Sequence, residues 1–252
     1  MNMATRTLEE LFSFVRDHPT ADFYRSAVSD AQRLEDVPLT SREMFAGTPL
    51  SSRRYKEVKS LQKIARLNDI PFISEWDFED ISKEAYGETA ARPMVYMSNA
   101  HEALEKSMWC YGRGVVPLAG ETDPALAIYA ASKYRIDGLI TDPAALSRIA
   151  PHMPERTEPL GSITLIADSF DVRSLMRFAP LAQRVRLVLA LPETGAFAQA
   201  ELSASPVFKP VPDCLIERQG NAVVVTKFAQ LVTPIIRYKV DIQPDLFFDG
   251  VY

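Results

Sequence analysis

The first third of the chain shows apolar positions with the period of amphipathic helices. Apolar residues between 8 and 15 recur at three- and four-residue spacing, and Thr7 or Thr5 precedes them as a capping residue. A second helix is expected from Asp22. Another is expected at Thr40, where Thr-Ser-Arg-Glu has the order of a capping box with Thr40 as the cap. Further helices are expected at residues 53–67 and 75–86.

From residue 93 the pattern changes to short apolar runs separated by helical stretches. The runs predict strands at residues 94–97, 115–118, 138–141, 163–166 and 186–190. Helices are expected between them, at residues 102–111, 124–134 and 171–178, and after Asp142, which is followed by proline at the first helical position. Alternating strands and helices favour a largely parallel sheet covered on both faces.

After Gly195 the helical period ends. Residues 206–242 predict antiparallel strands, with a hairpin at 214–226 that turns at Gly-Asn. The chain is therefore expected to have an α/β fold in three parts. These are a helical N-terminal region (1–92), an α/β subdomain (93–200) and a small β subdomain (201–252).

Composition narrows the class of protein. The chain has 252 residues, of which 47% are hydrophobic, enough for one large domain or two lobes. A net charge of −5 disfavours a nucleic-acid partner. No apolar run is long enough for a membrane span, and the start does not read as a signal peptide. Cys110 and Cys214 lie far apart, which favours a reducing compartment, the cytoplasm.

The segment 233–241 reads Thr-Pro-Ile-Ile-Arg-Tyr-Lys-Val-Asp and follows the hairpin. It resembles the adenylate-forming (AMP-binding) ligases, in the branch of phenylacetate–CoA ligase and the capsular polysaccharide biosynthesis proteins. There the segment reads Thr-Pro-Leu-Ile-Arg-Tyr-Arg-Thr-Gly-Asp. Residues 114–120, 134–150 and 160–168 are similar to strand–helix units of the same family. The resemblance implies a truncated form of the ligases' N-terminal domain.

Three residues are candidates for the nucleotide site. By resemblance Asp241 would accept hydrogen bonds from the ribose hydroxyls of ATP or AMP, although an Asp at a strand end is also a common turn former. Arg237 would contact a phosphate or pair with an internal carboxylate. Residues 189–195 are similar to the family's Tyr-Gly-x-Thr-Glu-x-Gly, with matches at Glu193 and Gly195. Glu193 would then hold magnesium, or it is a solvated residue of a turn.

The resemblance also implies that the carboxylic acid substrate would lie near His101 and Gly120. His101 follows a predicted strand at a helix start, where α/β folds often bind small molecules. Its alternative role is that of a surface residue in a first helical turn. The acid would be aromatic or fatty, and the acceptor of its acyl group would be CoA or a carrier protein.

Two departures from the family pattern bear on activity. The segment 60–74, where the phosphate loop is expected, contains no glycine. The few residues after Asp241 would not provide the mobile C-terminal lid. We therefore predict a reduced, pseudoenzyme-like relative that binds an adenylate or a carboxylic acid without full ligase activity alone. The alternatives are a non-catalytic partner or assembly protein, and one half of a split enzyme with a separate lid or partner ligase chain.

Overall fold

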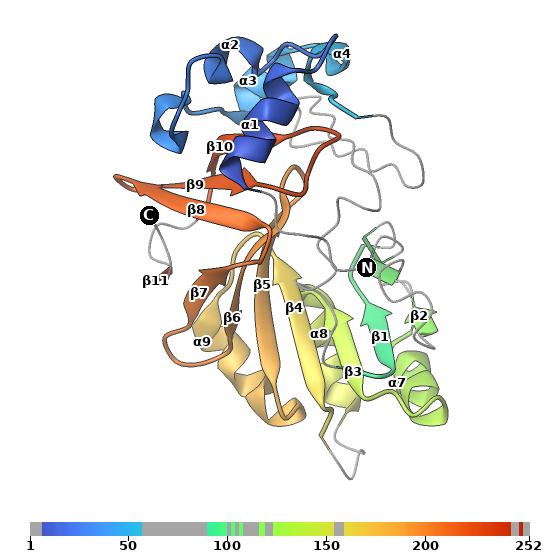
Figure 1. Ribbon diagram of the computed structural model, residues 1–252. Coiled ribbons are helices and arrows are strands. Elements are labelled where there is room, and N and C mark those ends of the chain that lie inside the picture. The colour runs from blue at the N-terminus through green and yellow to red at the C-terminus, as the bar shows by residue number, and fades with distance from the viewer. Residues whose placement is uncertain are drawn as a thin grey trace. The chain divides into compact units, whose positions relative to one another are not determined.

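The computed structural model describes residues 7–56, 90–99, 102–103, 106–107, 116–118, 123–153, 159–242 and 247–248. The chain forms two compact units (Figure 1). Unit 1 comprises Met1–Ser82, Leu191–Phe197 and Pro210–Tyr252, and unit 2 comprises Lys83–Ala190 and Ala198–Lys209. The three-part division at residues 92 and 200 stays a prediction.

Unit 2 is built on a mostly parallel sheet. Its strands are β1 (Pro93–Tyr96), β2 (Val116–Leu118), β3 (Gly138–Thr141), β4 (Ser162–Ala167), β5 (Val185–Leu191), β6 (Gly195–Glu201) and β7 (Val207–Pro210). They lie side by side in the order β7-β6-β5-β4-β3-β1-β2 (Figure 1). The pairs β1–β2, β1–β3, β3–β4 and β4–β5 are parallel. The prediction of an α/β fold with a largely parallel sheet is thus confirmed.

The described helices of unit 2 follow their strands. They are α7 (Pro124–Lys133), α8 (Pro143–Ile149), α9 (Val172–Leu175) and the 3-10 turns η3 (Ala150–His152) and η4 (Met176–Leu181). Asp142 caps α8 as predicted, and its side chain also accepts a hydrogen bond from the amide of Ser98, beyond β1. The single helix predicted at 171–178 is instead the short α9 followed by η4, because Pro180 lacks an amide proton.

Strands β1, β3 and β4 of unit 2 are continuous apolar runs because both of their sides are buried. All four residues of β1 and of β3 are buried, as are five of the six residues of β4. A parallel sheet covered on both faces needs apolar side chains on both sides of each strand. Fully buried members include Val95, Leu139, Ile163, Leu165 and Leu187.

Gly138, at the start of β3, has no room for a side chain. A Cβ at this position would lie 2.3 Å from the Cβ of Ala90 and 3.0 Å from the Oγ of Ser162. We expect Gly138→Ala to lower the free energy of unfolding by about 1–3 kcal/mol through overpacking. In Gly47→Ala the new methyl group meets no atom within 4 Å. Urea unfolding should therefore show this control to be neutral or slightly stabilised. Equal stability of both variants would contradict the statement that Gly138 has no room for a side chain.

Unit 1 combines short helices with an antiparallel sheet (Figure 1). The helices are α1 (Leu8–Arg16), α2 (Arg25–Val28), the 3-10 turn η1 (Leu34–Asp36), α3 (Arg42–Gly47) and α4 (Leu50–Arg53). Strands β8 (Cys214–Gln219), β9 (Ala222–Lys227) and β10 (Ile235–Val240) form the sheet, in the order β10-β9-β8, and a short strand β11 (Phe247–Phe248) follows. The hairpin β8–β9 and the antiparallel pairing confirm the prediction for residues 214–240, whereas β7 at residues 207–210 belongs to the mostly parallel sheet.

The caps of the described N-terminal helices were predicted in part. Thr7, one of the two residues expected to cap this helix, caps α1 and forms a capping box with Glu10. The prediction of Thr40 as the next cap was wrong, because Ser41 accepts the hydrogen bond from the amide of Met44. Thr40 is buried instead, and its backbone forms a bridge with Tyr238 of β10. The helices predicted at 53–67 and 75–86 lie almost entirely outside the described residues.

An aromatic cluster holds the helices of unit 1 to β10. The ring of Phe23 lies 4.7 Å from Tyr24 and 4.8 Å from Phe45, and Phe45 lies 5.6 Å from Tyr238, measured between centroids. The Phe23–Tyr24 and Phe45–Tyr238 pairs are edge-on, and such aromatic contacts add to the gain from burial. The hydroxyl of Tyr24 also accepts a hydrogen bond from the amide of Ile236. Tyr24 and Ile236, which are 212 positions apart in sequence, thus share one core.

Strand β6 was not predicted. Residues 192–194 form a turn after β5, and Gly195, with φ of +62°, begins β6 in the left-handed region that glycine adopts readily. β6 starts in unit 1 and continues into unit 2. Among the described helices, none has both the length and the apolar character needed to cross a bilayer.

Candidate functional site

Arg237 lies in β10 at an irregularity of the sheet. The register of β10 against β9 shifts between Ile235 and Tyr238, and Arg237 has φ of +48°, which is unusual for a residue with a side chain. Its amide donates to the hydroxyl of Thr226 at 3.0 Å. The bulge turns the side chain of Arg237 into the unit, where only 4% of the residue is exposed.

The guanidinium of Arg237 is occupied within unit 1. Its Nε and Nη2 lie 3.2 Å and 3.0 Å from the two carboxylate oxygens of Glu217 on β8. Its Nη1 donates to the carbonyl oxygens of Glu35 and Val37, at 2.9 Å and 2.6 Å. Of the two roles considered for Arg237, the structure supports pairing with an internal carboxylate. The arginine joins the loop around η1 to the sheet.

Glu193 lies in the turn between β5 and β6 and is completely buried. Its Oε1 accepts a hydrogen bond from the hydroxyl of Tyr238 at 2.8 Å and lies 3.5 Å from Nη2 of Arg42. Its carbonyl oxygen accepts from Nε2 of Gln230, which also donates to the carbonyl of Thr233. The turn was therefore expected correctly, but the alternative of a solvated Glu193 was wrong.

Burial and charge fix the protonation of the groups around Glu193. Burial, reinforced by the neighbouring carboxylate of Glu193, raises the pKa of Tyr238 well above its usual range. Tyr238 is therefore a neutral hydrogen-bond donor at physiological pH. Burial, the largest single effect, would lower the pKa of Arg42, but the interactions with Glu193 and Tyr238 together outweigh it and raise that pKa. Arg42 thus remains a cation beside Glu193.

The donor set around Glu193 does not fit a magnesium site. Oε1 is already used by Arg42 and Tyr238, and Oε2 is inaccessible to solvent and has no hydrogen-bond partner. Magnesium keeps several waters, which need room beside the carboxylate. Within the described part of the chain, no three His, Cys, Asp or Glu residues gather as metal ligands. Magnesium binding by Glu193 stays a prediction from the resemblance, and no step below passes through the metal.

Asp241 differs from the other two candidates. It follows Val240, the last residue of β10, and its side chain is exposed. The strand therefore presents a carboxylate to solvent where the resemblance expects the ribose-binding residue. His101 and Gly120, the predicted acid-binding residues, lie outside the described residues, as does the segment 60–74.

A further, partly buried ion pair of unit 1 joins Lys227 to Asp213. Nζ of Lys227 donates to Oδ1 of Asp213 at 3.0 Å and to the carbonyl of Ala196 at 2.7 Å. Cys214 pairs with Lys227 across the hairpin, and burial raises the pKa of its thiol to about 12. The thiol stays protonated at neutral pH, so Cys214 is a packing residue.

No sequence pattern indicated Arg42 as a partner of Glu193. The two residues are 151 positions apart and come from α3 and from the β5–β6 turn. Tyr238 belongs to the segment that carries the resemblance, yet nothing in its neighbours indicates that its hydroxyl meets Glu193. Both residues were therefore missed as site residues.

Comparison with known proteins identifies the fold. No protein-family model matches the chain, and no curated protein sequence matches it. Among solved structures, the chain is similar to 2-hydroxyisobutyryl-CoA ligase in the postadenylation state with 2-HIB-AMP, with a TM-score of 0.68 at 11% identity. The match covers 92% of this chain and 60% of the ligase. The chain therefore spans less than two thirds of that ligase.

Two further ligases are similar over smaller parts. A MenE variant from E. coli with bound OSB-AMS gives a TM-score of 0.52 at 10% identity, covering 71% of this chain and 42% of MenE. Coronafacic acid ligase from Pectobacterium brasiliense gives 0.50 at 13% identity, covering 76% of this chain and 42% of the ligase. At such identities the likeness shows the fold alone. This chain thus has a fold like that of part of the adenylate-forming ligases.

Proposed function

We propose that the chain is a reduced relative of the AMP-forming acid–thiol ligases that binds an adenylate through Asp241 and does not carry out the full ligase reaction alone. The observation that carries this proposal is the exposed carboxylate of Asp241 at the end of β10. It stands in a fold similar over 92% of the chain to a ligase solved with an acyl-adenylate.

The chemistry of Asp241 suits a ribose. A carboxylate can accept two hydrogen bonds from the neighbouring hydroxyls of the sugar, as acidic residues do in dinucleotide-binding folds. The group must face solvent to be reached, and Asp241 does. By resemblance, the acid would be aromatic or fatty and would lie near His101 and Gly120. CoA or a carrier protein would be the acceptor.

The expected lack of turnover follows from the ion pairs that Arg237 and Glu193 form within the protein. Acyl-adenylate formation depends on positioned positive charge that neutralises the phosphates. The guanidinium of Arg237 is paired with Glu217, and the carboxylate of Glu193 is paired with Arg42. In this conformation neither is available to a phosphate or a metal. Binding of the nucleoside part is therefore retained while chemistry on the phosphates is weakened.

A second candidate is one half of a split acyl-activating enzyme. The match covers 60% of the hydroxyisobutyryl-CoA ligase, and this candidate assigns the remaining part of such a ligase to a separate lid or partner chain. A non-catalytic assembly role is the remaining alternative. In either case the two widely separated cysteines favour the cytoplasm.

Thermal unfolding with AMP tests the proposed site. AMP at 100 times its dissociation constant should stabilise the protein by about 2.7 kcal/mol, a shift of about 5–10 °C in Tm for a chain of this size. Asp241→Ala should abolish the shift. Asp30→Ala removes another exposed carboxylate of unit 1 and should leave the shift unchanged. ATP–pyrophosphate exchange that depends on Asp241 would contradict the proposed lack of turnover.

A further inference from the structure

The helix α7 presents large apolar side chains to solvent. Its small residues Ala127, Ala130 and Ala131 are buried. On other positions Leu126 is 54% exposed and Tyr129 is 61% exposed. A surface helix normally buries its large apolar residues, so the exposure of Leu126 and Tyr129 on α7 is unusual.

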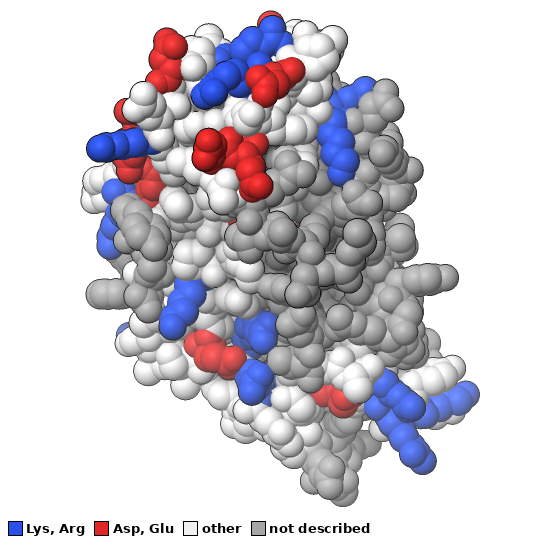
Figure 2. All heavy atoms as spheres, viewed as in Figure 1, with Lys and Arg blue, Asp and Glu red and all other residues white. Residues whose placement is uncertain are grey.

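Basic side chains accompany this apolar face. Nζ of Lys133 lies 5.9 Å from the ring centroid of Tyr129 and 5.8 Å from that of Tyr134, which is also exposed. Arg92 and Arg135 are exposed nearby, and Arg92 donates to the carbonyl of Tyr134. The segment from 124 to 136 contains no acidic residue. Figure 2 shows blue side chains gathered at the lower right, the position of α7 in Figure 1. We call Leu126, Tyr129, Lys133 and Tyr134 the α7 ridge.

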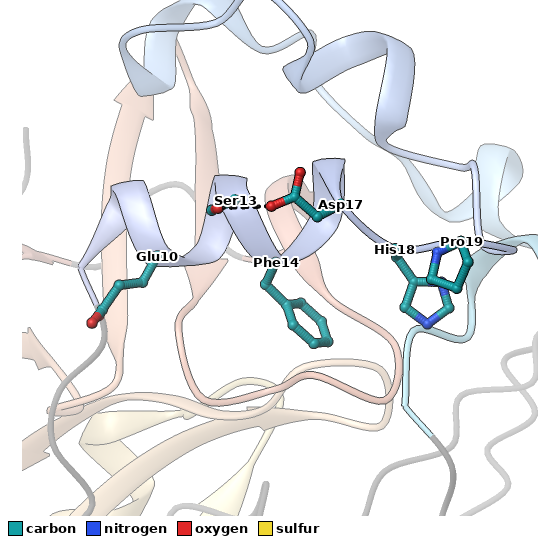
Figure 3. A pocket seen from close by; sticks show the side chains of 6 residues that line it. All are labelled: Glu10, Ser13, Phe14, Asp17, His18 and Pro19. Carbon is teal, nitrogen blue, oxygen red and sulfur yellow. Dashed lines mark hydrogen bonds between the residues drawn. The ribbon is translucent and has the colours of Figure 1, made fainter.

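Unit 1 carries a groove with acidic residues at its edges, whereas the α7 ridge carries a basic residue. The groove has a volume of about 460 Å³ and lies along α1 and the residues that follow it (Figure 3). Its lining consists of Glu10, Ser13, Phe14, Asp17, His18 and Pro19. Glu10, Phe14 and His18 project to the same side of the chain (Figure 3), because they lie four residues apart.

The groove combines an apolar floor with acidic edges. The rings of Phe14 and His18 each lie against Tyr55, at centroid distances of 6.3 Å and 5.1 Å. Nδ1 of His18 accepts a hydrogen bond from the amide of Ala21 at 3.0 Å, which fixes the ring. The carboxylates of Glu10 and Asp17 are exposed. Aromatic and cationic side chains are the groups that such a surface attracts.

We propose that the α7 ridge of one copy docks in the α1 groove of a second copy of this chain. The ridge supplies tyrosine rings and the lysine ammonium, and the groove supplies an aromatic floor with two carboxylates. Each copy has one ridge and one groove, so the contact is heterologous and repeats from copy to copy into rings or open chains. This inference does not depend on the adenylate site.

The contact is expected to be weak and sensitive to salt. One exposed face of a ten-residue helix buries less than the ~1,200 Å² typical of stable interfaces. Sedimentation velocity should therefore show self-association that grows with concentration above about 100 μM, in the range of transient contacts. Raising the salt from 0.1 M to about 1 M should reduce it, because the charges are exposed.

Charge reversal on either side provides the decisive test. The ridge variant carries Lys133→Glu and Arg135→Glu. The groove variant carries Ser13→Lys, Asp17→Lys and Glu10→Gln. Glutamine at position 10 retains the capping box of α1, so the fold is preserved. Each variant alone should be monomeric, because its two surfaces now carry like charges. A mixture of the two should associate again, because each ridge then meets a groove of opposite charge.

The controls make each outcome informative. Both variants should unfold within about 2 °C of the parent, as expected for exposed positions. Met44→Ser removes an apolar side chain that is 45% exposed on α3 and should leave association unchanged. A parent chain that stays monomeric up to about 1 mM would overturn the proposal. So would single variants that associate like the parent, or a mixture that associates no better than its components.

Discussion

Replacing Arg237 by methionine is expected to lower the free energy of unfolding by about 3–5 kcal/mol, the cost of leaving one partner of a buried ion pair uncompensated. The side chains of Arg237 and Glu217 are only 5% and 7% exposed, so solvent cannot take over the charge of Glu217. The loss also removes the donor to the carbonyls of Glu35 and Val37. Urea unfolding followed by circular dichroism measures the change.

The double variant separates the ion pair from the packing. Arg237→Met with Glu217→Met removes both charges and should regain part of the lost stability, since two apolar residues can replace a buried pair. The recovery is incomplete because two carbonyls still lack their donor. Lys239→Met, an exposed cation on the same strand, should change stability by less than about 0.5 kcal/mol. An Arg237→Met variant of unchanged stability with weakened AMP binding would instead assign Arg237 to a phosphate.

Replacing Arg42 by methionine should lower the free energy of unfolding by about 3 kcal/mol, the low end of the range for a broken buried pair. The low end applies because the side chain of Arg42 is 20% exposed and its nitrogen is 3.5 Å from Glu193. Glu193 is left buried with one hydrogen bond, from Tyr238. Adding Glu193→Gln to this variant should restore much of the loss, because the unpaired charge disappears.

The effect of added Mg²⁺ on stability distinguishes two roles for Glu193, as the ion-pair partner of Arg42 or as a metal ligand. If Arg42 is the cation that neutralises Glu193, millimolar Mg²⁺ should not rescue the stability of Arg42→Met, since the donor set has no room for the metal's waters. A rescue by Mg²⁺ that disappears in the Glu193→Gln background would show that Glu193 is a metal ligand. Arg218→Met, an exposed arginine on β8, is the matched control and should be nearly neutral.

The parallel sheet could be predicted because its strands are short, apolar on both sides and bounded by helix caps. β3 was predicted at its observed bounds, and the Asp142 cap fixed the start of α8. β6 was missed because Gly195–Glu201 is rich in alanine and has no β-branched residue. Burial of Phe197 and Ala198, not local propensity, makes it a strand. Thr40 and Ser41 are both good caps, and the choice was decided by the bridge that Thr40 makes with Tyr238.

The candidate site could be predicted only for residues whose role depends on their neighbours in sequence. Asp241 follows directly from the segment 233–241 and its strand end. The environment of Glu193 depends on Arg42 and Tyr238, which come from distant parts of the sequence. The choice for Arg237 between phosphate and internal carboxylate depended on Glu217, two strands away, and on a bulge with positive φ. Such long-range pairings leave no pattern in neighbouring residues.

A calorimetric titration of AMP into the protein, with Mg²⁺ and again with EDTA, tests the central claim most directly. Binding to the parent chain that is equal in both buffers, lost in Asp241→Asn and retained in Asp30→Asn, is the predicted result. It would mean that the ligase-like fold recognises the nucleoside through Asp241, with the charge of Glu193 balanced internally by Arg42. No heat of binding in either buffer, or binding that requires Mg²⁺ and survives Asp241→Asn, would contradict the account.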